Sequence, residues 1–336
     1  MFTDHITEST FYHKVIIPLW SRLTVFFSPN HGLFIGYLLI AFLIAVIFFS
    51  WKRKTWNPVK SGREVILMHN FTSQSSIDDL KLYFFDKIIL GFIYSSILGA
   101  TFFFRNQIMD LLASTGLPTQ HYVPGVVISL LLTLGALVVF DFAVFFEHYL
   151  SHKILVLWEF HKIHHIAEHL TPLTAYRSHP VNQSCFILLV SVFTGIYSGI
   201  VGYFFAAKHA YIVFAGQNFF MFLLLMLGLN LQHSMVYLRY PKFIRNIFVS
   251  PAYHQLHHSS DIQHHDMNFG FIFSFWDKLF GTQMFPPAKA DLAFGITGEK
   301  YENYSGLKNT YFTPFRRAVK RIKKIFGKHF SSPDSD

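Results

Sequence analysis

Residues 123–147 read VPGVVISLLLTLGALVVFDFAVFFE and run directly into HYLSH at residues 148–152. A helix needs roughly 20 apolar residues to cross the hydrocarbon core of a bilayer, and this stretch supplies them. Two histidines, His148 and His152, follow at its end, and positions i and i+4 of a helix project from the same face. The stretch therefore predicts a membrane helix that delivers two imidazoles to one point.

The composition of the whole chain indicates a membrane protein. Of its 336 residues, 52% are hydrophobic and 14% are charged, which is too little charge to cover a soluble protein of this size. A single cysteine, Cys185, excludes an internal disulfide scaffold. We expect an all-α fold: a polytopic membrane helical bundle of about four to five spans with a histidine-rich helical cap on the cytosolic side. The expected spans are residues 33–50, 88–104, 123–147, 185–207 and 210–231, the last two forming a tight hairpin.

Three regions follow from this pattern. Residues 1–121 form an N-terminal membrane region, residues 122–285 a membrane region that carries most histidines, and residues 286–336 a basic tail. With the N-terminus outside, 24 of the 28 Lys and Arg residues fall on the inner side, where positive charge accumulates in membrane proteins. We therefore expect the histidine motifs and the C-terminus to be cytosolic, in a bacterial inner membrane or an endoplasmic reticulum membrane.

The basic tail has a helical pattern of its own between residues 314 and 330. Apolar residues recur along one face and seven Lys and Arg residues surround them. The apolar positions are Phe315, Val319, Ile322, Phe326 and Phe330. This pattern predicts a basic amphipathic helix lying on anionic lipid, with a frayed, solvated tail as the alternative. Basic patches interleaved with aromatic residues do not recur elsewhere, so nucleic acid is not an expected partner.

Histidine is concentrated in one part of the sequence. Of 20 histidines, 14 lie between His148 and His265. Three motifs place them at helical spacing and together supply eight imidazoles: His148-x3-His152, His161-x2-His164-His165 and His254-x2-His257-His258. Buried imidazoles need partners, and neutral imidazole is the commonest metal ligand in proteins. The motifs therefore predict a metal site.

The number and type of these ligands narrow the choice of metal. One tetrahedral zinc takes four ligands and would leave half of the set idle. Two first-row ions such as iron suit eight to ten imidazoles, because these metals accept nitrogen donors. Two other classes of protein are alternatives to a metal enzyme: a membrane electron carrier with a bis-histidine haem, and an inactive scaffold that retains the fold.

The same motifs resemble the membrane fatty acid hydroxylase/sterol desaturase superfamily of histidine-box enzymes. The flanking residues add to the resemblance, which covers residues 140–282. They are Leu157-Trp158 before the second motif, Arg177-Ser178-His179-Pro180 after it, and Asn268-Phe269-Gly270 and Trp276-Asp277 after the third. The resemblance implies a non-haem di-iron enzyme that uses O2 as co-substrate and oxidises an unactivated C–H bond of a membrane lipid. Hydroxylation is the expected outcome and desaturation the alternative.

The resemblance also assigns residues to this site. It implies two iron ions, and the eight motif histidines carry over as metal ligands. His179 and His233 are expected as ninth and tenth ligands, with helix capping or support of a ligand as the alternative role. Asp141 lies seven residues before His148, on nearly the same helical face, and is expected to hold the second ring nitrogen of a ligand. An interfacial role for Asp141 is the alternative.

The electrons for such a reaction must come from outside the chain. The sequence contains no dinucleotide-binding glycine fingerprint after a strand, and its His179-Pro180 element lacks the signature of a fused cytochrome b5 domain. We therefore expect a separate donor, a cytochrome b5-like protein or a ferredoxin. A basic cytosolic face would attract an acidic donor.

Overall fold

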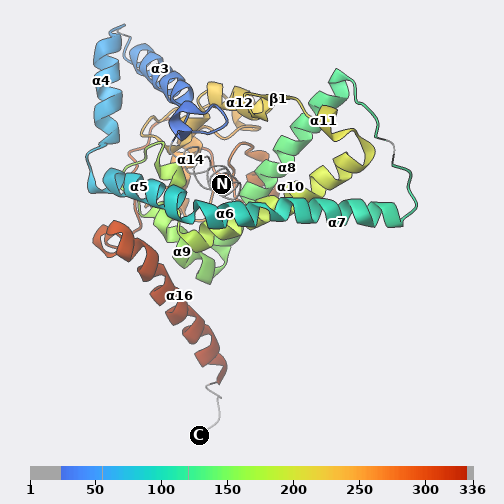
Figure 1. Ribbon diagram of the computed structural model, residues 1–336. Coiled ribbons are helices and arrows are strands. Elements are labelled where there is room, and N and C mark those ends of the chain that lie inside the picture. The colour runs from blue at the N-terminus through green and yellow to red at the C-terminus, as the bar shows by residue number, and fades with distance from the viewer. Residues whose placement is uncertain (1–23, 55, 120, 331–336) are drawn as a thin grey trace, which may run out of the picture.

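The structure, a computed structural model, describes residues 24–54, 56–119 and 121–330. It is mostly helical, and four helical runs among the described residues are long and apolar enough to cross a membrane (Figure 1). These runs are α3 (Ile35–Lys52), Gln74–Ser114, α8 (Val126–Lys153) and α10 (Pro180–Phe204). The second run contains α5 (Gln74–Phe85), the π-helical turn η3 (Asp86–Leu90), α6 (Gly91–Leu98) and α7 (Ala100–Ser114). The predicted all-α polytopic bundle is confirmed, and four of its five expected spans lie in these runs.

Short helices and one β-hairpin complete the described structure. Before the histidine-rich region they are η2 (Val25–Phe27) and α4 (Pro58–His69). The middle of the chain holds α9 (Leu155–His165), η4 (Thr174–Tyr176), α11 (Ala207–Ala210), β1 (Val213–Phe214), β2 (Gln217–Asn218), α12 (Phe219–Met226) and η5 (Leu229–His233). The remainder holds α13 (Lys242–Arg245), α14 (Pro251–His257), η6 (Ile262–His264), α15 (Phe275–Phe280), η7 (Tyr301–Asn303) and α16 (Gly306–Phe330).

The expected fifth span is wrong as a continuous helix. Residues 210–231 instead form the hairpin of β1 and β2, the eight-residue α12 and the start of η5. A turn at Ala215 and Gly216, both with positive φ, interrupts the apolar run, and Gly228 with φ 86° ends α12. Asn218 then caps α12 and donates a hydrogen bond to the carbonyl oxygen of Thr133 on α8. The chain therefore returns from the end of α10 to the histidine region without a fifth spanning helix.

Local sequence signals set the start of several other helices. The Asn57 and Ser73 side chains accept hydrogen bonds from backbone N–H groups at the starts of α4 and α5. Ser250 does the same for α14, which has Pro251 in its first turn. Such residues satisfy backbone donors that have no partner within the helix. In α14 this cap fixes where the third histidine motif begins.

Close packing of α7 against α10 depends on glycine. A Cβ atom at Gly199 would lie 2.7 Å from the backbone oxygen of Arg105, and one at Gly195 would lie 2.8 Å from that of Thr101. Small residues four positions apart let two membrane helices approach at backbone distance. This contact holds α10, whose first turn borders the histidine region, alongside α7 (Figure 1).

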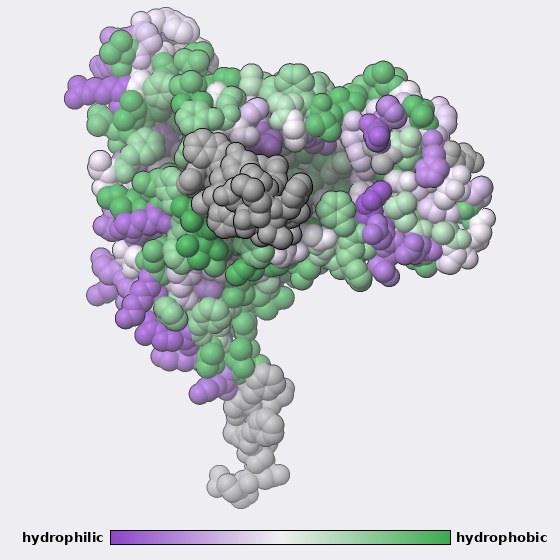
Figure 2. Space-filling view, viewed as in Figure 1, coloured by the Kyte–Doolittle hydropathy of each residue, from purple (hydrophilic) through white to green (hydrophobic). Residues whose placement is uncertain are grey.

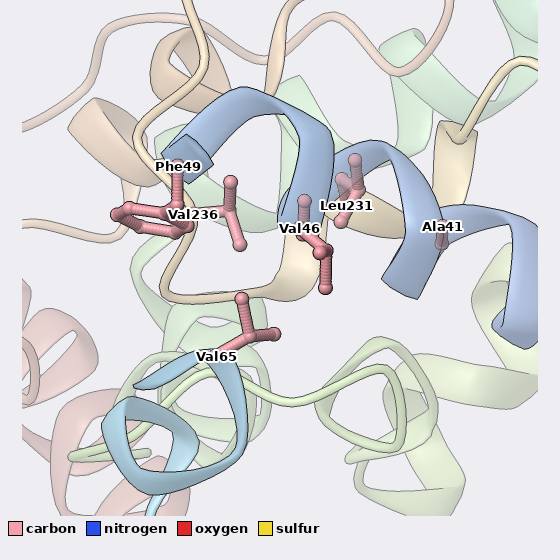
Figure 3. Packing of buried hydrophobic residues seen from close by; sticks show 7 residues of the cluster. Ala41, Val46, Phe49, Val65, Leu231 and Val236 are labelled. Carbon is pink, nitrogen blue, oxygen red and sulfur yellow. The ribbon is translucent and has the colours of Figure 1, made fainter. Parts of the chain in front are cut away.

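A buried apolar cluster joins α3 and α4 to η5 and to the segment that follows it. It contains Ala41, Ala45, Val46 and Phe49 of α3, Val65 of α4, and Leu231 and Val236 (Figure 3). The cluster lies on one side of α3, whereas Leu39, Leu43 and Ile47 on another side are exposed. An exposed apolar stripe on a spanning helix is the surface that faces lipid.

The hydropathy of the surface agrees with a membrane-embedded molecule. Figure 2 shows hydrophobic side chains over much of the visible face, with hydrophilic side chains gathered at its left edge and at its right end. In the same view α7 and α10 run toward the right end (Figure 1). The apolar middle is the part of the molecule that a bilayer would surround.

The basic tail forms a helix that begins earlier than residue 314. Helix α16 packs against α9, and Arg321 donates a hydrogen bond of 2.8 Å to Glu159 on that helix. Phe315, Val319 and Ile322 remain exposed along α16. The amphipathic helix is therefore present, in place of a frayed tail over the described residues, and its contact with anionic lipid stays a prediction.

Candidate metal centre

Nine histidines of the described chain converge in two compact groups. The first, here the five-histidine group, contains His148, His152, His161, His165 and His257; the second, the four-histidine group, contains His164, His233, His254 and His258. Within each group the candidate ligand atoms all lie within 4.8 Å of one another. The structure thus brings together all eight motif histidines and His233, the last residue of η5.

Helical spacing explains how the motifs are shared between the groups. His161 and His165 are four residues apart on α9 and lie in the five-histidine group, whereas His164 projects into the other. On α14 and its C-cap, His254 and His258 share the four-histidine group and His257 belongs to the first. The two groups are adjacent, since the rings of His165 and His258 are stacked with centroids 4.6 Å apart.

The inward ring nitrogens have the spacing of ligands around an ion. Four pairs of Nε2 atoms are separated by 3.0–3.2 Å: His152 with His165, His164 with His233, His233 with His254, and His254 with His258. Nitrogen ligands bonded at about 2.0–2.1 Å to one ion lie roughly 3 Å apart. The Nε2 atoms of His148, His161 and His257 are buried with no hydrogen-bond partner. Buried polar atoms without partners are costly, and a metal ion would satisfy them.

The same packing bears on the haem alternative. In these four pairs the imidazole nitrogens face each other at hydrogen-bond distance. A porphyrin between two axial histidines needs a planar gap wide enough for the macrocycle, and none of these pairs leaves one. The geometry of these four pairs therefore fits small ions and does not fit a bis-histidine haem.

Outward ring nitrogens are held by fixed acceptors. The Nδ1 atoms of His148, His257 and His164 donate to the backbone oxygens of Phe269, Met267 and Arg177, at 3.0, 2.8 and 3.3 Å. A carbonyl oxygen only accepts, so Nδ1 carries the proton and the Nε2 lone pair points inward. Hydrogen bonds of this kind orient metal-binding imidazoles and raise their basicity.

Burial also keeps the imidazoles neutral. It lowers the pKa of His164 to about 3, helped by the neighbouring charge of His148, and lowers the pKa of His254 and His258 well below the usual value of 6.5. Neutral imidazole is the form that binds metal ions. At neutral pH these side chains are therefore ready to act as ligands.

A buried polar network supports His161. Its Nδ1 atom donates to Asn182 Oδ1 at 2.9 Å, and Asn182 Nδ2 donates to Glu147 Oε1 at 2.6 Å. Ser151 also donates to Glu147 Oε1, at 2.7 Å. Because the amide nitrogen of Asn182 faces Glu147, its oxygen must face His161, which fixes the tautomer of that imidazole. Asn182 was not among the residues expected from the sequence; its position in the first turn of α10, after the His179-Pro180 element, was the available signal.

Arg177 holds the second histidine motif in place. Its fully buried guanidinium donates to the backbone oxygen of Ile163 on α9 and pairs with Asp79 of α5 at 2.8 Å. It also donates to the hydroxyl of Tyr301, which donates in turn to Asp78. These contacts tie α9 to the N-terminal region and to the segment before α16, so the three predicted regions interlock around the site.

A cavity of about 380 Å³ opens beside both groups. Five of the nine histidines line it: His148, His161, His164, His233 and His254. Apolar side chains of α8 and α10 continue the lining, among them Phe140, Val144 and Phe186. The cavity lining thus combines imidazoles with apolar side chains of two spanning helices and with polar side chains such as Glu147 and Asn182.

His179 lies outside both groups, contrary to the expectation that it is a metal ligand. It is the N-cap of α10: its Nδ1 accepts from the backbone N–H of Val181, and its Nε2 donates to the backbone oxygen of Tyr311 on α16. Both ring nitrogens therefore have partners other than a metal. His264 and His265, in and after η6, also lie outside the groups.

Asp141 does not contact any histidine through its hydrogen bonds, so the expected role in holding a ligand's ring is corrected. Its buried carboxylate accepts from the backbone N–H groups of Ile272 and Phe273, at 2.7 and 3.0 Å, and from Trp276 Nε1 at 3.0 Å. A different acidic residue, Asp266, lies next to one of the clustered histidines: its Oδ1 atom is 3.4 Å from His152 Nδ1. Asp141 instead anchors the chain that follows the third motif onto α8.

Comparison with known proteins agrees with this geometry. Residues 133–282 match the family model described as fatty acid hydroxylase. The chain is 29% identical over 192 residues to ornithine lipid hydroxylase OlsE of Rhizobium tropici. That match covers 57% of this chain and 52% of the relative, so the chain spans about half the length of the curated relative. No solved structure matches the chain. The predicted resemblance to the fatty acid hydroxylase superfamily is confirmed over residues 133–282, which contain all nine clustered histidines.

Proposed function

We propose that this protein is an integral-membrane lipid hydroxylase whose nine clustered histidines hold two non-haem iron ions. The observation that carries the proposal is the cavity of about 380 Å³, because it joins five of those histidines to apolar side chains on two spanning helices. A lipid chain that enters from the bilayer between α8 and α10 would reach the imidazoles along the apolar side chains of this lining. The fatty acid hydroxylase match and the lipid hydroxylase relative support the substrate class.

The donor set fits iron. All nine proposed ligands are imidazoles, which suit iron as well as zinc, copper and nickel. Two groups of five and four ligands match two ions better than one. When bound, the iron pair would supply activation of O2 toward an unactivated C–H bond, with two electrons from a separate ferredoxin or cytochrome b5-like donor.

The chain itself positions the reactants. Phe140 and Val144 of α8 and Phe186 of α10 line the path of the acyl chain and exclude water from the cavity. Placement of one methylene next to the imidazoles decides which position reacts, since misplacement by about 1 Å can cost roughly a hundredfold in rate. Asn182 and the backbone oxygens of Phe269 and Met267 hold the ligand rings in fixed orientation.

The test is metal content and lipid product measured on the same protein. Protein purified in detergent, without chelators, from iron-supplemented cells should contain about two irons per chain. His161→Ala and His257→Ala should each lower that content. Lipids extracted from expressing cells should gain one oxygen atom on an acyl chain. His265→Ala is the matched control, because His265 is exposed and outside both groups.

Four results would contradict the proposal. A haem spectrum would point to an electron carrier, and no metal in folded protein would point to a scaffold. Loss of two hydrogen atoms from the lipid, in place of a gain of oxygen, would show a desaturase that uses the same centre. If the purified protein contains only zinc, it is reconstituted with ferrous iron under anaerobic conditions. Failure of the reconstituted protein to form product would then count against the proposal.

A further inference from the structure

A second cavity, of about 420 Å³, lies between α7 and the last turns of α10. It shares no lining residue with the cavity beside the histidine groups. Its lining comes from α7, from α10 and from the segment that follows α11, and includes Thr101, Phe102, Arg105, Ser198, Gly202 and Tyr211. The substrate path proposed above therefore does not use this cavity.

The cavity lies at the membrane interface opposite the histidine groups. Helix α10 begins at Pro180 beside those groups, and its 25 residues extend over roughly 37 Å at a rise of about 1.5 Å per residue. The apolar core of a bilayer is about 30 Å thick, so Gly202, in the last turn, lies near the headgroup layer. Tyr203 and Tyr211 occur at this end as well, and tyrosine is enriched at membrane interfaces. Lipid phosphates are the anions found at this depth.

Arg105 is the one cation of the cavity lining, and its charge has no acidic partner. Among the residues that the structure describes, no carboxylate lies within ion-pair distance of it. Asp110, the one acidic residue of α7, is exposed and does not line the cavity. The guanidinium lies against Gly202, where an added Cβ atom would be 3.4 Å from Arg105 Nη2. A charge on a spanning helix is costly unless it is paired or hydrated, and an anion in this cavity would pair it.

Two buried hydroxyl groups of the same lining have no hydrogen-bond partner within the described part of the chain: Thr101 Oγ1 and Tyr211 Oη. Tyr211 is near the cation, because burial raises the pKa of its hydroxyl and the positive charge of Arg105 acts in the opposite direction. A hydroxyl donates one hydrogen bond, and phosphate oxygens accept hydrogen bonds from hydroxyl and guanidinium groups alike. One phosphate would therefore satisfy the charge and both hydroxyls.

The lining also favours one class of lipid headgroup. It contains no acidic side chain. A headgroup with an ammonium group, such as phosphatidylethanolamine, would bring a second positive charge near Arg105 without a carboxylate to receive it. A headgroup whose only charge is the phosphate avoids this repulsion. Phe102 lines the cavity and is 67% exposed on a spanning run, so the lining continues into the surface where an acyl chain would lie.

We propose that the cavity between α7 and α10 binds the phosphate of an anionic phospholipid, with Arg105 as the cation and Thr101 and Tyr211 as hydrogen-bond donors. The site needs no metal and lies at the other end of α10 from the histidine groups, so the inference is independent of the proposed function. A lipid bound here contacts both α7 and the end of α10. It should therefore stabilise the folded protein, as any ligand specific to the folded state does.

Lipid binding is tested by native mass spectrometry of the protein in detergent, with phosphatidylglycerol and phosphatidylethanolamine titrated separately. The wild type should bind one phosphatidylglycerol, and Arg105→Gln should weaken that binding about tenfold, because it removes a charged hydrogen-bond donor. Lys208→Gln is the matched control, since Lys208 is an exposed cation just after α10 and does not line the cavity. Equal affinity of the two variants would refute the site. Equal binding of both lipids by the wild type would refute the headgroup assignment.

A conservative variant separates a built site from an arginine that only extends into the headgroup layer. Tyr211→Phe keeps the ring and removes the hydroxyl, and should weaken phosphatidylglycerol binding about fivefold. Tyr122→Phe, at a tyrosine 51% exposed near the same end, should bind as the wild type does. Unchanged binding in Tyr211→Phe would show an arginine among headgroups without a specific site, and the proposal would fail.

Two further measurements identify the source of the phosphate and control for folding. Inorganic phosphate should not displace phosphatidylglycerol from the wild type; displacement would show a site for a soluble anion and overturn the lipid assignment. Phosphatidylglycerol should raise the Tm of the wild type and leave that of Arg105→Gln at its lipid-free value. The lipid-free Tm shows whether each variant folds. Gly202→Leu, which keeps Arg105 and fills the cavity, should lose the same stabilisation, and a full lipid-induced rise in Tm in this variant would place the lipid elsewhere.

Discussion

At the scale of single residues, the proposed metal centre depends on side chains other than the nine clustered histidines. Asn182 fixes the His161 imidazole and connects it to Glu147 inside the bundle. Asn182→Ala should leave His161 Nδ1 and Glu147 without this partner, and loss of such support typically costs about 10–100-fold in metal affinity. The measurement is a Co2+ titration followed by the visible spectrum of the bound ion. Asn246→Ala, at an exposed position, is the control; an unchanged affinity in Asn182→Ala would remove this residue from the site.

Asp141 is expected to act on folding more than on metal binding. Asp141→Ala leaves two backbone N–H groups and the Trp276 indole N–H buried without an acceptor. Each such group costs about 1–3 kcal/mol, so the variant should lose roughly 3 kcal/mol or more of stability. Unfolding in mixed detergent micelles measures the loss. A variant with wild-type stability that fails to bind metal would restore the ligand-support role that the sequence suggested.

Much of this site could be predicted because helical spacing is a strong signal. Histidines at i, i+3 and i+4 share a helix face, and His161, His164 and His165 do project from α9 as expected. His179 could not be separated from the ligands by pattern, because a histidine before proline serves equally as a helix cap. Asp141 was equally ambiguous, since a shared face with His148 does not fix which neighbour its carboxylate meets.

At the scale of elements, His179 couples the start of α10 to α16. Its Nδ1 must stay unprotonated to accept from Val181, and burial lowers its pKa to about 4, from the usual 6.5. Because the folded-state pKa is lower than that of the unfolded chain, the folded state binds fewer protons. Its contribution to stability is therefore complete above pH 6.5 and is lost progressively as the pH falls toward 4.

The His179→Asn variant isolates this effect. Asn remains an N-cap acceptor but does not titrate, so the dependence of stability on pH between 6.5 and 4 should be shallower than in the wild type. Thermal unfolding at a series of pH values gives the slope, and the metal-ligand histidines contribute equally to both proteins. Parallel curves for the two proteins would show that His179 does not carry this acid sensitivity.

The expected fifth span was wrong for a physical reason that the sequence pattern does not reveal. Residues 210–231 are apolar enough for a span, but Ala215 and Gly216 form a turn and Asn218 caps α12, which no hydropathy average detects. The Asn218 side chain also donates a hydrogen bond to the backbone oxygen of Thr133 on α8, a helix far away in the sequence. Long-range contacts of this kind determine where a helix ends, whereas length and apolarity determine only whether one can span.

At the scale of the whole molecule, the site and the C-terminal helix must share one side of the membrane. Both histidine groups lie where α8 ends and α10 begins, and α16 packs on α9 at the same place. The end of α7 and the start of α8 lie at the other end of these spanning helices (Figure 1). Positive charge accumulates on the cytosolic side of membrane proteins. The basic helix α16 lies at the same end of the spanning helices as the two histidine groups.

This arrangement predicts a cytosolic site, and a reporter at the C-terminus reads its location. In a bacterial host, green fluorescent protein fused after Asp336 should fluoresce, and alkaline phosphatase fused there should be inactive. Alkaline phosphatase fused after Thr115, just past α7, should be active, because that loop is expected outside. The opposite pattern would place the histidine groups on the outer face, where neither a cytosolic ferredoxin nor cytochrome b5 could reach them. The three fusions together test on which side of the membrane the histidine groups lie.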